Sequence, residues 1–218
     1  MTHKVEIDGF EIVHDVLDAT ERQRLICSLG PVSGAGKRGI LTIADIARLA
    51  RSDLLCDLIR PHLDGHPRPV RAIYFDKSPH ANWLVPWHQD LTLAVRENIS
   101  TEGFGPWSLK DGVHHVQPPI SLLEQMITIR LHLDAVDASN GALRVLPGSH
   151  LLGRLSADQI TEQRSLRDEF LCTAPAGAGM LMRPLLLHAS GRSSHAGHRR
   201  VLHIEYASFD LPGELEWA

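Results

Sequence analysis

The spacing of apolar residues in the first part of the chain predicts one short strand followed by a helix. Residues 5–13 have the pattern of a short strand. Asp18, followed three residues later by Glu21, is a helix-capping pattern, and the apolar spacing after it predicts a helix that reaches about Leu29. Gly30 ends this predicted helix.

A loop and two further helices are predicted next. Residues 31–41 are rich in Gly and Ser and predict a loop. Residues 43–63 carry apolar side chains at helical spacing, which predicts two helices broken near Ser52.

The remainder of the chain has the pattern of a β-rich domain. Runs of β-branched and apolar residues are separated by Pro, Gly, Asp and Asn, and one short helix is predicted at 156–163. The predicted strands are 70–75, 126–133, 143–146, 170–172, 179–182 and 199–208. Helices followed by strands predict an α+β, mainly β domain whose sheets form a sandwich or a barrel.

Two of these strands alternate with little interruption. In 126–133, Thr128, Arg130 and His132 share one face and the apolar residues share the other. In 199–208, Arg199 begins a similar polar face. In an open sheet such a face would meet water. In a barrel it would line a pocket, while the apolar face would pack under the N-terminal helices.

The length and composition of the chain are typical of a single globular domain. The chain has 218 residues, of which 43% are hydrophobic, enough to bury one substantial core. We expect a single domain over residues 1–218, with a strand and supporting helices in 1–66 and the β core in 67–210.

Charge and cysteine usage exclude several classes of partner and compartment. The net charge is −4 and the basic residues are dispersed, which argues against nucleic acid. Three scattered Cys residues and a polar N-terminus indicate a cytoplasmic protein, and no apolar run approaches the roughly 20 residues that span a bilayer. We expect a small-molecule substrate, no membrane partner, and a monomer or homodimer.

His88 and Asp90 are the most informative pair of residues. On an extended backbone, residues two apart point to the same face, so both can reach one ion while Gln89 points away. The chain has fourteen His residues, so this spacing alone can arise by chance. A third candidate ligand, His188, completes a two-His, one-carboxylate set of the kind that binds non-haem Fe(II) with open positions.

Three segments together resemble the phytanoyl-CoA dioxygenase family. They are Trp-His-Gln-Asp at 87–90, Asn-Gly-Ala-Leu-Arg-Val-Leu-Pro-Gly-Ser-His at 140–150, and the segment 188–206, in which Ser190 follows His188 by two residues and Arg199 by eleven. The resemblance covers most of residues 69–207. It implies a double-stranded β-helix, or jelly roll, with the N-terminal helices packed on one sheet.

The resemblance also implies an activity and roles for individual residues. The family comprises Fe(II)- and 2-oxoglutarate-dependent oxygenases, so His88, Asp90 and His188 would hold the iron, and 2-oxoglutarate and O2 would be consumed. Arg199 would bind the distal carboxylate of 2-oxoglutarate, which suits a planar guanidinium fork, and Ser190 would donate to the same carboxylate. The expected reaction is hydroxylation of an unactivated C–H bond, with release of succinate and CO2.

The connection 98–117 is a candidate lid over the iron, because long loops often carry binding residues. We expect it to contribute the substrate contacts Trp107, His114 or His115, and Gln117. Arg130, on the polar face of its strand, is a further candidate for the pocket.

Two other functional classes are also compatible with the sequence. The same three ligands could hold Zn²⁺ in a hydrolase, although the chain lacks a helical H-E-x-x-H arrangement. The barrel could also bind a ligand without catalysis, although an intact ligand set argues against this.

Overall fold

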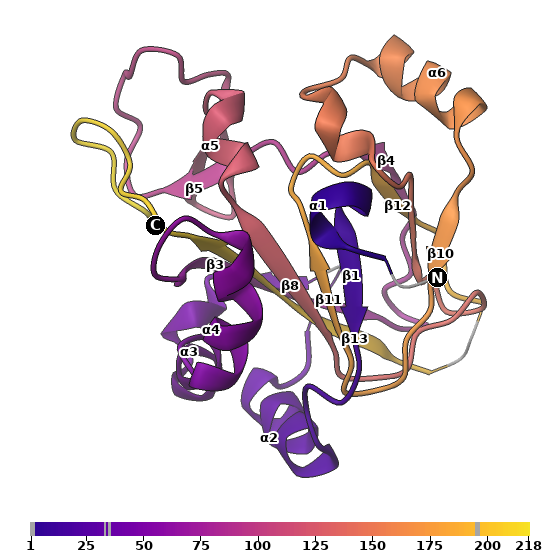
Figure 1. Cartoon of the computed structure of the whole chain (residues 1–218). Helices are drawn as coiled ribbons and strands as arrows, with labels where there is room; N and C mark the ends of the chain where they lie inside the picture. Colours follow the sequence, from indigo (N-terminus) through magenta and orange to yellow (C-terminus); the bar gives the residue numbers. More distant parts are fainter. Residues whose placement is uncertain (1–2, 33, 35, 195–196) are drawn as a thin grey trace.

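The chain forms antiparallel sheets with a small number of helices (Figure 1). The structure is a computed structural model, and it describes residues 3–32, 34, 36–194 and 197–218. The strands are β1 (Phe10–Val13), β2 (Gly36–Arg38), β3 (Arg68–Lys77), β4 (Val85–His88), β5 (Leu93–Val95), β6 (Trp107–Lys110), β7 (Val113–Val116), β8 (Ile127–His132), β9 (Leu143–Val145), β10 (Phe170–Cys172), β11 (Gly179–Met182), β12 (His188–Ser190) and β13 (Arg199–Ala207). The helices are α1 (Val5–Asp8), α2 (Ala19–Leu29), α3 (Ala44–Ala50), α4 (Asp53–Ile59), α5 (Ile120–Glu124) and α6 (Ala157–Leu166), with short 3-10 turns at Ile40–Thr42, Arg60–His62 and Ser149–Leu152.

The strands form two main sheets and one small one. A six-stranded sheet has the order β1-β11-β8-β13-β3-β2, and a four-stranded sheet has the order β10-β9-β12-β4. All their pairings are antiparallel. The small sheet, β5-β7-β6, is formed within residues 93–116. This is the jelly-roll arrangement expected from the sequence.

The N-terminal helices cover one face of the six-stranded sheet. In Figure 1, α2, α3 and α4 lie together beside the strands of this sheet. Apolar side chains of these helices pack against Ile127, Ile129 and Leu131 of β8 and against Leu202 and Ile204 of β13. The alternation in β8 and β13 is therefore confirmed, since their apolar faces meet the helices and their polar faces turn inward.

Capping residues set the boundaries of these helices. The Asp18 side chain accepts a hydrogen bond from the backbone N–H of Glu21, and α2 ends before Gly30. Ser52 caps α4 through Leu55 N–H and separates it from α3, as the sequence predicts. Among the described residues, no helix has the length and apolar character needed to cross a membrane.

The prediction of one strand over 5–13 is correct only for its second half. Val5–Asp8 is a helical turn, and β1 begins only at Phe10. Gly9 separates the two elements with φ of 84°, a conformation that glycine adopts without strain. The predicted loop 31–41 is also partly wrong, because Gly36–Arg38 pairs with β3 as strand β2; residues 33 and 35 lie outside the described part of the chain.

The predicted lid is partly a β-hairpin. β6 and β7 pair through a two-residue turn formed by Asp111 and Gly112, which have φ of 51° and 78°. Positive φ at both positions is the type I′ geometry for which Asp-Gly is a strong signal. That dipeptide was therefore the missed indication of a hairpin inside the segment 98–117.

Candidate metal centre and anion site

Two neighbouring strands of the four-stranded sheet hold the three candidate metal ligands. His88 is the last residue of β4 and pairs directly with His188, the first residue of β12. Asp90 follows β4 by two residues, and its backbone N–H donates to Pro184 O at 2.9 Å. Residues a hundred positions apart in the sequence are thus brought together by strand pairing.

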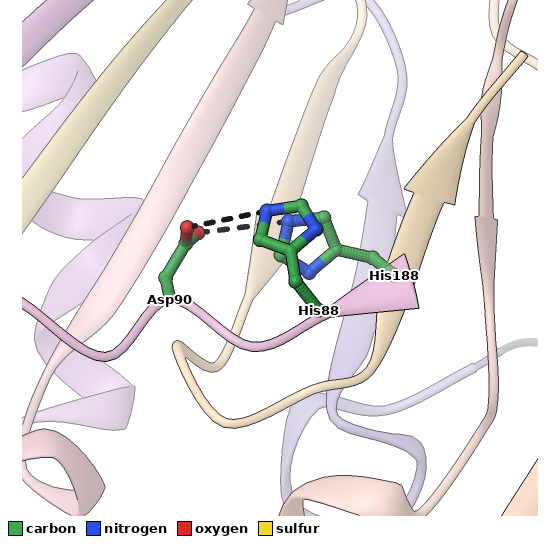
Figure 2. Close-up of side chains that lie close together, drawn as sticks. All are labelled: His88, Asp90 and His188. Atoms are coloured by element: carbon green, nitrogen blue, oxygen red, sulfur yellow. Dashed lines mark ion pairs between the residues drawn. The ribbon is translucent and has the colours of Figure 1, made fainter. Parts of the chain in front are cut away.

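The three side chains converge on one point (Figure 2). Asp90 Oδ1 lies 3.7 Å from His88 Nε2, and Asp90 Oδ2 lies 3.7 Å from His188 Nε2. One ligand atom from each residue lies within 4.8 Å of the others. The three residues are therefore close enough to share a single ion.

Backbone carbonyls fix the orientation of both imidazoles. His88 Nδ1 lies 2.9 Å from Pro86 O, and His188 Nδ1 lies 2.9 Å from Leu186 O. A carbonyl only accepts, so each Nδ1 carries the proton and each Nε2 presents a lone pair to the centre. Burial lowers the pKa of His188, which keeps this ring neutral and able to bind a metal.

The Asp90 side chain is also in the protonation state that a metal ligand requires. Burial alone would raise the pKa of Asp90, but the nearby His188, His203 and His88 more than offset this, and the pKa lies below its usual range. Asp90 is therefore ionised at neutral pH.

Gln89 points away from the centre, as expected, and anchors surrounding segments. Its Nε2 donates to Gly153 O at 2.8 Å and to Leu185 O at 2.7 Å, and its Oε1 accepts from Leu155 N–H at 2.9 Å. These bonds hold the backbone on both sides of the metal ligands.

A cavity of about 430 Å³ opens beside the three ligands, between the two main sheets. Its lining includes residues of β3, β8 and β13 from one sheet and of β4, β9 and β12 from the other. The polar and charged residues in the lining, apart from the metal ligands, are Arg38, Arg71, Gln89, Thr92, Lys110, Gln117, Arg130, Ser190, Arg199 and His203.

Arg199 is the inward member of an adjacent arginine pair. It lines the cavity with only 3% of its surface exposed, and its Nε has no partner among the described residues. Burial, followed by the nearby Arg130, lowers the pKa of Arg199 to about 9. Arg200 instead forms a bidentate ion pair with Asp134, at 2.7 Å from both Nε and Nη2. Arg199 therefore faces the cavity, whereas its role in binding 2-oxoglutarate stays a prediction.

Lys77 is a charged residue of this region that the sequence analysis missed. It is directly opposite Arg199 in the β3–β13 register, and none of its surface is exposed. Its Nζ donates to Ser190 Oγ at 2.6 Å and to Gly191 O, and it lies 5.3 Å from the Trp83 ring. Burial, together with Arg199 and Arg130, lowers the pKa of Lys77 to about 7.

Ser190 lines the cavity, but its hydrogen bonds differ from the expected ones. Its single O–H donates to Gly141 O at 2.7 Å, while its oxygen accepts from Lys77. Gly141 has φ of 80°, a conformation that glycine adopts without strain. A bond from Ser190 to a bound carboxylate would need its O–H to turn away from Gly141, and that role stays a prediction.

The other candidate substrate contacts divide into two groups. Gln117 and Arg130 line the cavity, and Arg130 Nη1 donates to His203 Nδ1 at 3.0 Å. Trp107, His114 and His115 are not part of the lining of this cavity, and their contact with a substrate stays a prediction. Trp107 packs against the apolar cluster beneath the small sheet, and His115 faces a separate, mainly apolar cavity of about 140 Å³.

The chemistry of these groups fits Fe(II) and 2-oxoglutarate. The two imidazoles and one carboxylate are a donor set that Fe(II) accepts with positions left open. Buried Arg199 has no ion pair within the described residues and its Nε has no hydrogen-bond partner there, so it can accept an anionic ligand. The distal carboxylate of 2-oxoglutarate is such an anion, and Arg199 and the three metal ligands line the same cavity.

The chain thus combines a jelly-roll fold with a convergent set of two histidines and one carboxylate. The family model described as phytanoyl-CoA dioxygenase matches residues 8–201, and the chain belongs to this family.

Two curated relatives carry the same class of activity in their names. The chain is 27% identical over 180 residues to a probable alpha-ketoglutarate-dependent hypophosphite dioxygenase of Stutzerimonas stutzeri, covering 76% of this chain and 54% of that protein. It is 27% identical over 189 residues to L-proline trans-4-hydroxylase of Streptomyces griseoviridis, covering 73% of this chain and 62% of that protein. The chain thus spans only part of the length of both relatives.

Solved structures share the fold over nearly the whole chain. AviO1 from Streptomyces viridochromogenes Tue57 has a TM-score of 0.67 at 22% identity, covering 96% of this chain and 94% of that one. EctD from S. alaskensis, with 2-oxoglutarate and 5-hydroxyectoine, has a TM-score of 0.70 at 17% identity, covering 94% and 73%. At these identities the likeness supports the jelly-roll fold.

Proposed function

We propose that this protein hydroxylates an unactivated C–H bond of a small molecule. The observation that carries the proposal is the presence, in one cavity, of three convergent metal ligands and a buried arginine without an ion pair among the described residues. Bound there, Fe(II) and 2-oxoglutarate would supply the oxidising chemistry, in which O2 is consumed and succinate, CO2 and a hydroxylated product are formed.

The residues of the chain orient and enclose the reactants. Arg199 would hold the distal carboxylate through two parallel charge-assisted hydrogen bonds, which fixes the direction of 2-oxoglutarate toward the metal ligands. Lys77 and Arg130 would add positive charge at the same end of the cavity. Lys77 would also hold the Ser190 oxygen in place while the Ser190 proton is shared between Gly141 O and the carboxylate.

The two alternative classes make different use of the site. A zinc hydrolase would use the three ligands and a water, but it would leave Arg199 without a partner in a place where an unpaired charge is costly. A non-catalytic binding protein would have no need for two imidazoles held with Nε2 free. The iron-dependent oxygenase is the class that uses both features.

Formation of succinate from 2-oxoglutarate is the decisive test. The Fe(II)-loaded protein should release succinate and CO2 in the presence of O2 and ascorbate, slowly without substrate and faster with it. The Asp90→Ala variant should not, whereas Asp168→Ala, which changes an exposed carboxylate outside the cavity, should behave as the parent. Absence of succinate from the parent under all conditions would contradict the proposal.

A further inference from the structure

The cavity has a second group of cationic side chains, away from Arg199. On β3, Arg71 and Lys77 are six residues apart and share the inner face, which separates them by roughly 20 Å. Ile73 and Phe75, between them on the same face, line the cavity, as Arg71 does. The cavity therefore runs along β3 from the Arg199 end to a second end at Arg71.

Arg71 is only partly engaged by the protein. Its Nη1 donates to Thr92 O at 3.3 Å and lies 3.4 Å from Glu205 Oε1. Glu205 is shared, because the same oxygen lies 3.3 Å from His203 Nε2. A guanidinium has five N–H donors. Within the described residues, the hydrogen bond and the ion pair of Arg71 both involve Nη1. Donors of Arg71 thus remain for a ligand.

Lys110 approaches the same end from the hairpin. In the β6–β7 register, Lys110 is opposite Val113 and Ser108 is opposite His115, so these four side chains share one face of the hairpin. Lys110 lines the main cavity. Its ammonium group makes no ion pair or hydrogen bond with the described residues. Arg38 and Arg71 line the same cavity as Lys110, and burial, followed by these two cations, lowers the pKa of Lys110.

The charges in the cavity are unbalanced even when 2-oxoglutarate is included. Five cationic side chains contribute to the lining, whereas Asp90, a metal ligand, is its only acidic residue among those described. A dianionic co-substrate would be balanced at the inner end by Arg199 and Arg130, with Lys77 behind them. Of the outer cations, Arg38 is paired with Asp111 and Arg71 with Glu205, whereas Lys110 has no ion pair within the described part of the chain. This excess exists in a protein whose net charge is −4.

We propose that the substrate is a small organic acid, whose anionic oxygen group binds to Arg71 and Lys110 at the outer end of the cavity. The acid would then extend inward, so that a C–H bond lies beside His88 and Asp90. The inference rests on the proposed hydroxylase function and adds the substrate class to it. A cavity of about 430 Å³, shared with a five-carbon co-substrate, limits the acid to a small one.

Ligand-observed NMR on an inert form of the protein tests the binding step. The protein is loaded with Zn(II) and saturating 2-oxoglutarate, and a panel of short-chain carboxylic acids and alkylphosphonates is added, each beside its uncharged amide or ester. At least one acid should bind, and its uncharged partner should not. The two kinds of acid in the panel show whether the cations accept a carboxylate, a phosphonate or both.

Variants then assign the binding to the two cations. The double variant Arg71→Gln/Lys110→Gln should lose roughly tenfold or more in affinity for the acid. The matched control Arg96→Gln/Lys37→Gln removes two exposed cations that do not line the cavity, and it should retain that affinity. If the double variant does not fold, Lys110→Gln alone tests whether the cations bind the acid, because Lys110 is exposed and its replacement should not disturb the fold.

Three results on the binding of the acid would overturn the inference. In the first, an acid and its uncharged amide or ester bind equally well. In the second, the double variant and Lys110→Gln both keep the affinity of the parent for the acid. In the third, no acid binds although 2-oxoglutarate binds normally. A loss of 2-oxoglutarate affinity as large as the loss of acid affinity would assign the cations to the co-substrate and would also overturn it. Failure of the proposed function looks different, because then the parent protein would not form succinate from 2-oxoglutarate at all.

Discussion

Lys77 and Arg199 lie directly opposite each other on the antiparallel strands β3 and β13, and both are almost completely buried. Like charges at directly opposite positions of a sheet destabilise it. Neither residue has a carboxylate ion pair among the described residues. When Lys77 is protonated, the folded protein therefore carries an electrostatic cost that an anion bound near this pair would relieve.

The arginine pair on β13 gives the first prediction. Arg199→Ala should weaken 2-oxoglutarate binding by about 30-fold or more, because removal of one partner of a desolvated charge pair costs roughly 2–5 kcal/mol. Arg199→Lys should recover only part of this loss, since it keeps the charge and loses the bidentate fork. Titration calorimetry of 2-oxoglutarate into the anaerobic Fe(II) or Mn(II) form measures the effect.

Arg200→Ala is the matched control for this experiment. Arg200 pairs with Asp134 outside the cavity, so its loss should leave 2-oxoglutarate affinity within a few-fold and mainly lower stability. A larger loss of affinity for Arg200→Ala than for Arg199→Ala would show that the assignment of the inward residue is wrong.

Lys77 gives a prediction with opposite effects on stability and binding. Lys77→Met should weaken 2-oxoglutarate binding, because it removes positive charge beside Arg199 and the donor to Ser190. It should also stabilise the ligand-free protein, because the buried ammonium is replaced by an apolar side chain of similar length. Urea unfolding of both proteins, with and without 2-oxoglutarate, separates the two effects.

The pH dependence of stability gives an independent check on Lys77. Its pKa falls from 10.5 to about 7 on folding, so between these values the unfolded chain binds more protons than the folded protein. Stability of the ligand-free parent should therefore gain a contribution that rises with pH through this window. In Lys77→Met this contribution should be absent. Equal slopes of unfolding free energy against pH in parent and variant would contradict the lowered pKa.

The metal ligands give a prediction that includes a binding measurement. His88→Ala, Asp90→Ala or His188→Ala should each abolish turnover and strongly weaken Mn(II) or Fe(II) binding, while the fold is retained. His66→Ala, at an exposed position outside the cavity, is the control for surface histidines. Metal titration followed by circular dichroism measures both properties, and near-parent turnover in Asp90→Ala would show that the carboxylate is wrongly assigned.

Two of the three candidate metal ligands, His88 and Asp90, could be placed together from the sequence because their geometry is local. A spacing of two on an extended backbone places His88 and Asp90 on one side, and the same alternation separates Arg199 from Arg200. His188 required the family resemblance, since the strand pairing that brings it to His88 joins distant parts of the chain. The alternating faces of β8 and β13 likewise depend only on period two, and both were predicted correctly.

Features that depend on tertiary contacts could not be predicted in the same way. Burial of Lys77 follows from its bonds to Ser190 and Gly191, more than a hundred residues later, and no local pattern indicates it. The places of Trp107 and His115 depend on which face of the hairpin meets the core. Asp111-Gly112 was a local signal for this hairpin, but the direction of its faces follows only from the packing on β3.

The hairpin itself gives the last prediction. Lys110 and Gln117 line the cavity, so a bound acid would contact the hairpin and the segment that follows it. A bound metal without the acid would make no such contact. Amide hydrogen exchange over residues 107–117 should therefore slow when 2-oxoglutarate and an acid that binds are present together, and much less with the metal alone. The Lys110→Gln variant should lose most of this protection, while exchange in α2, which packs on the far face of the six-stranded sheet, serves as the internal control. Exchange over 107–117 that stays the same in the complete complex would remove the hairpin from substrate binding.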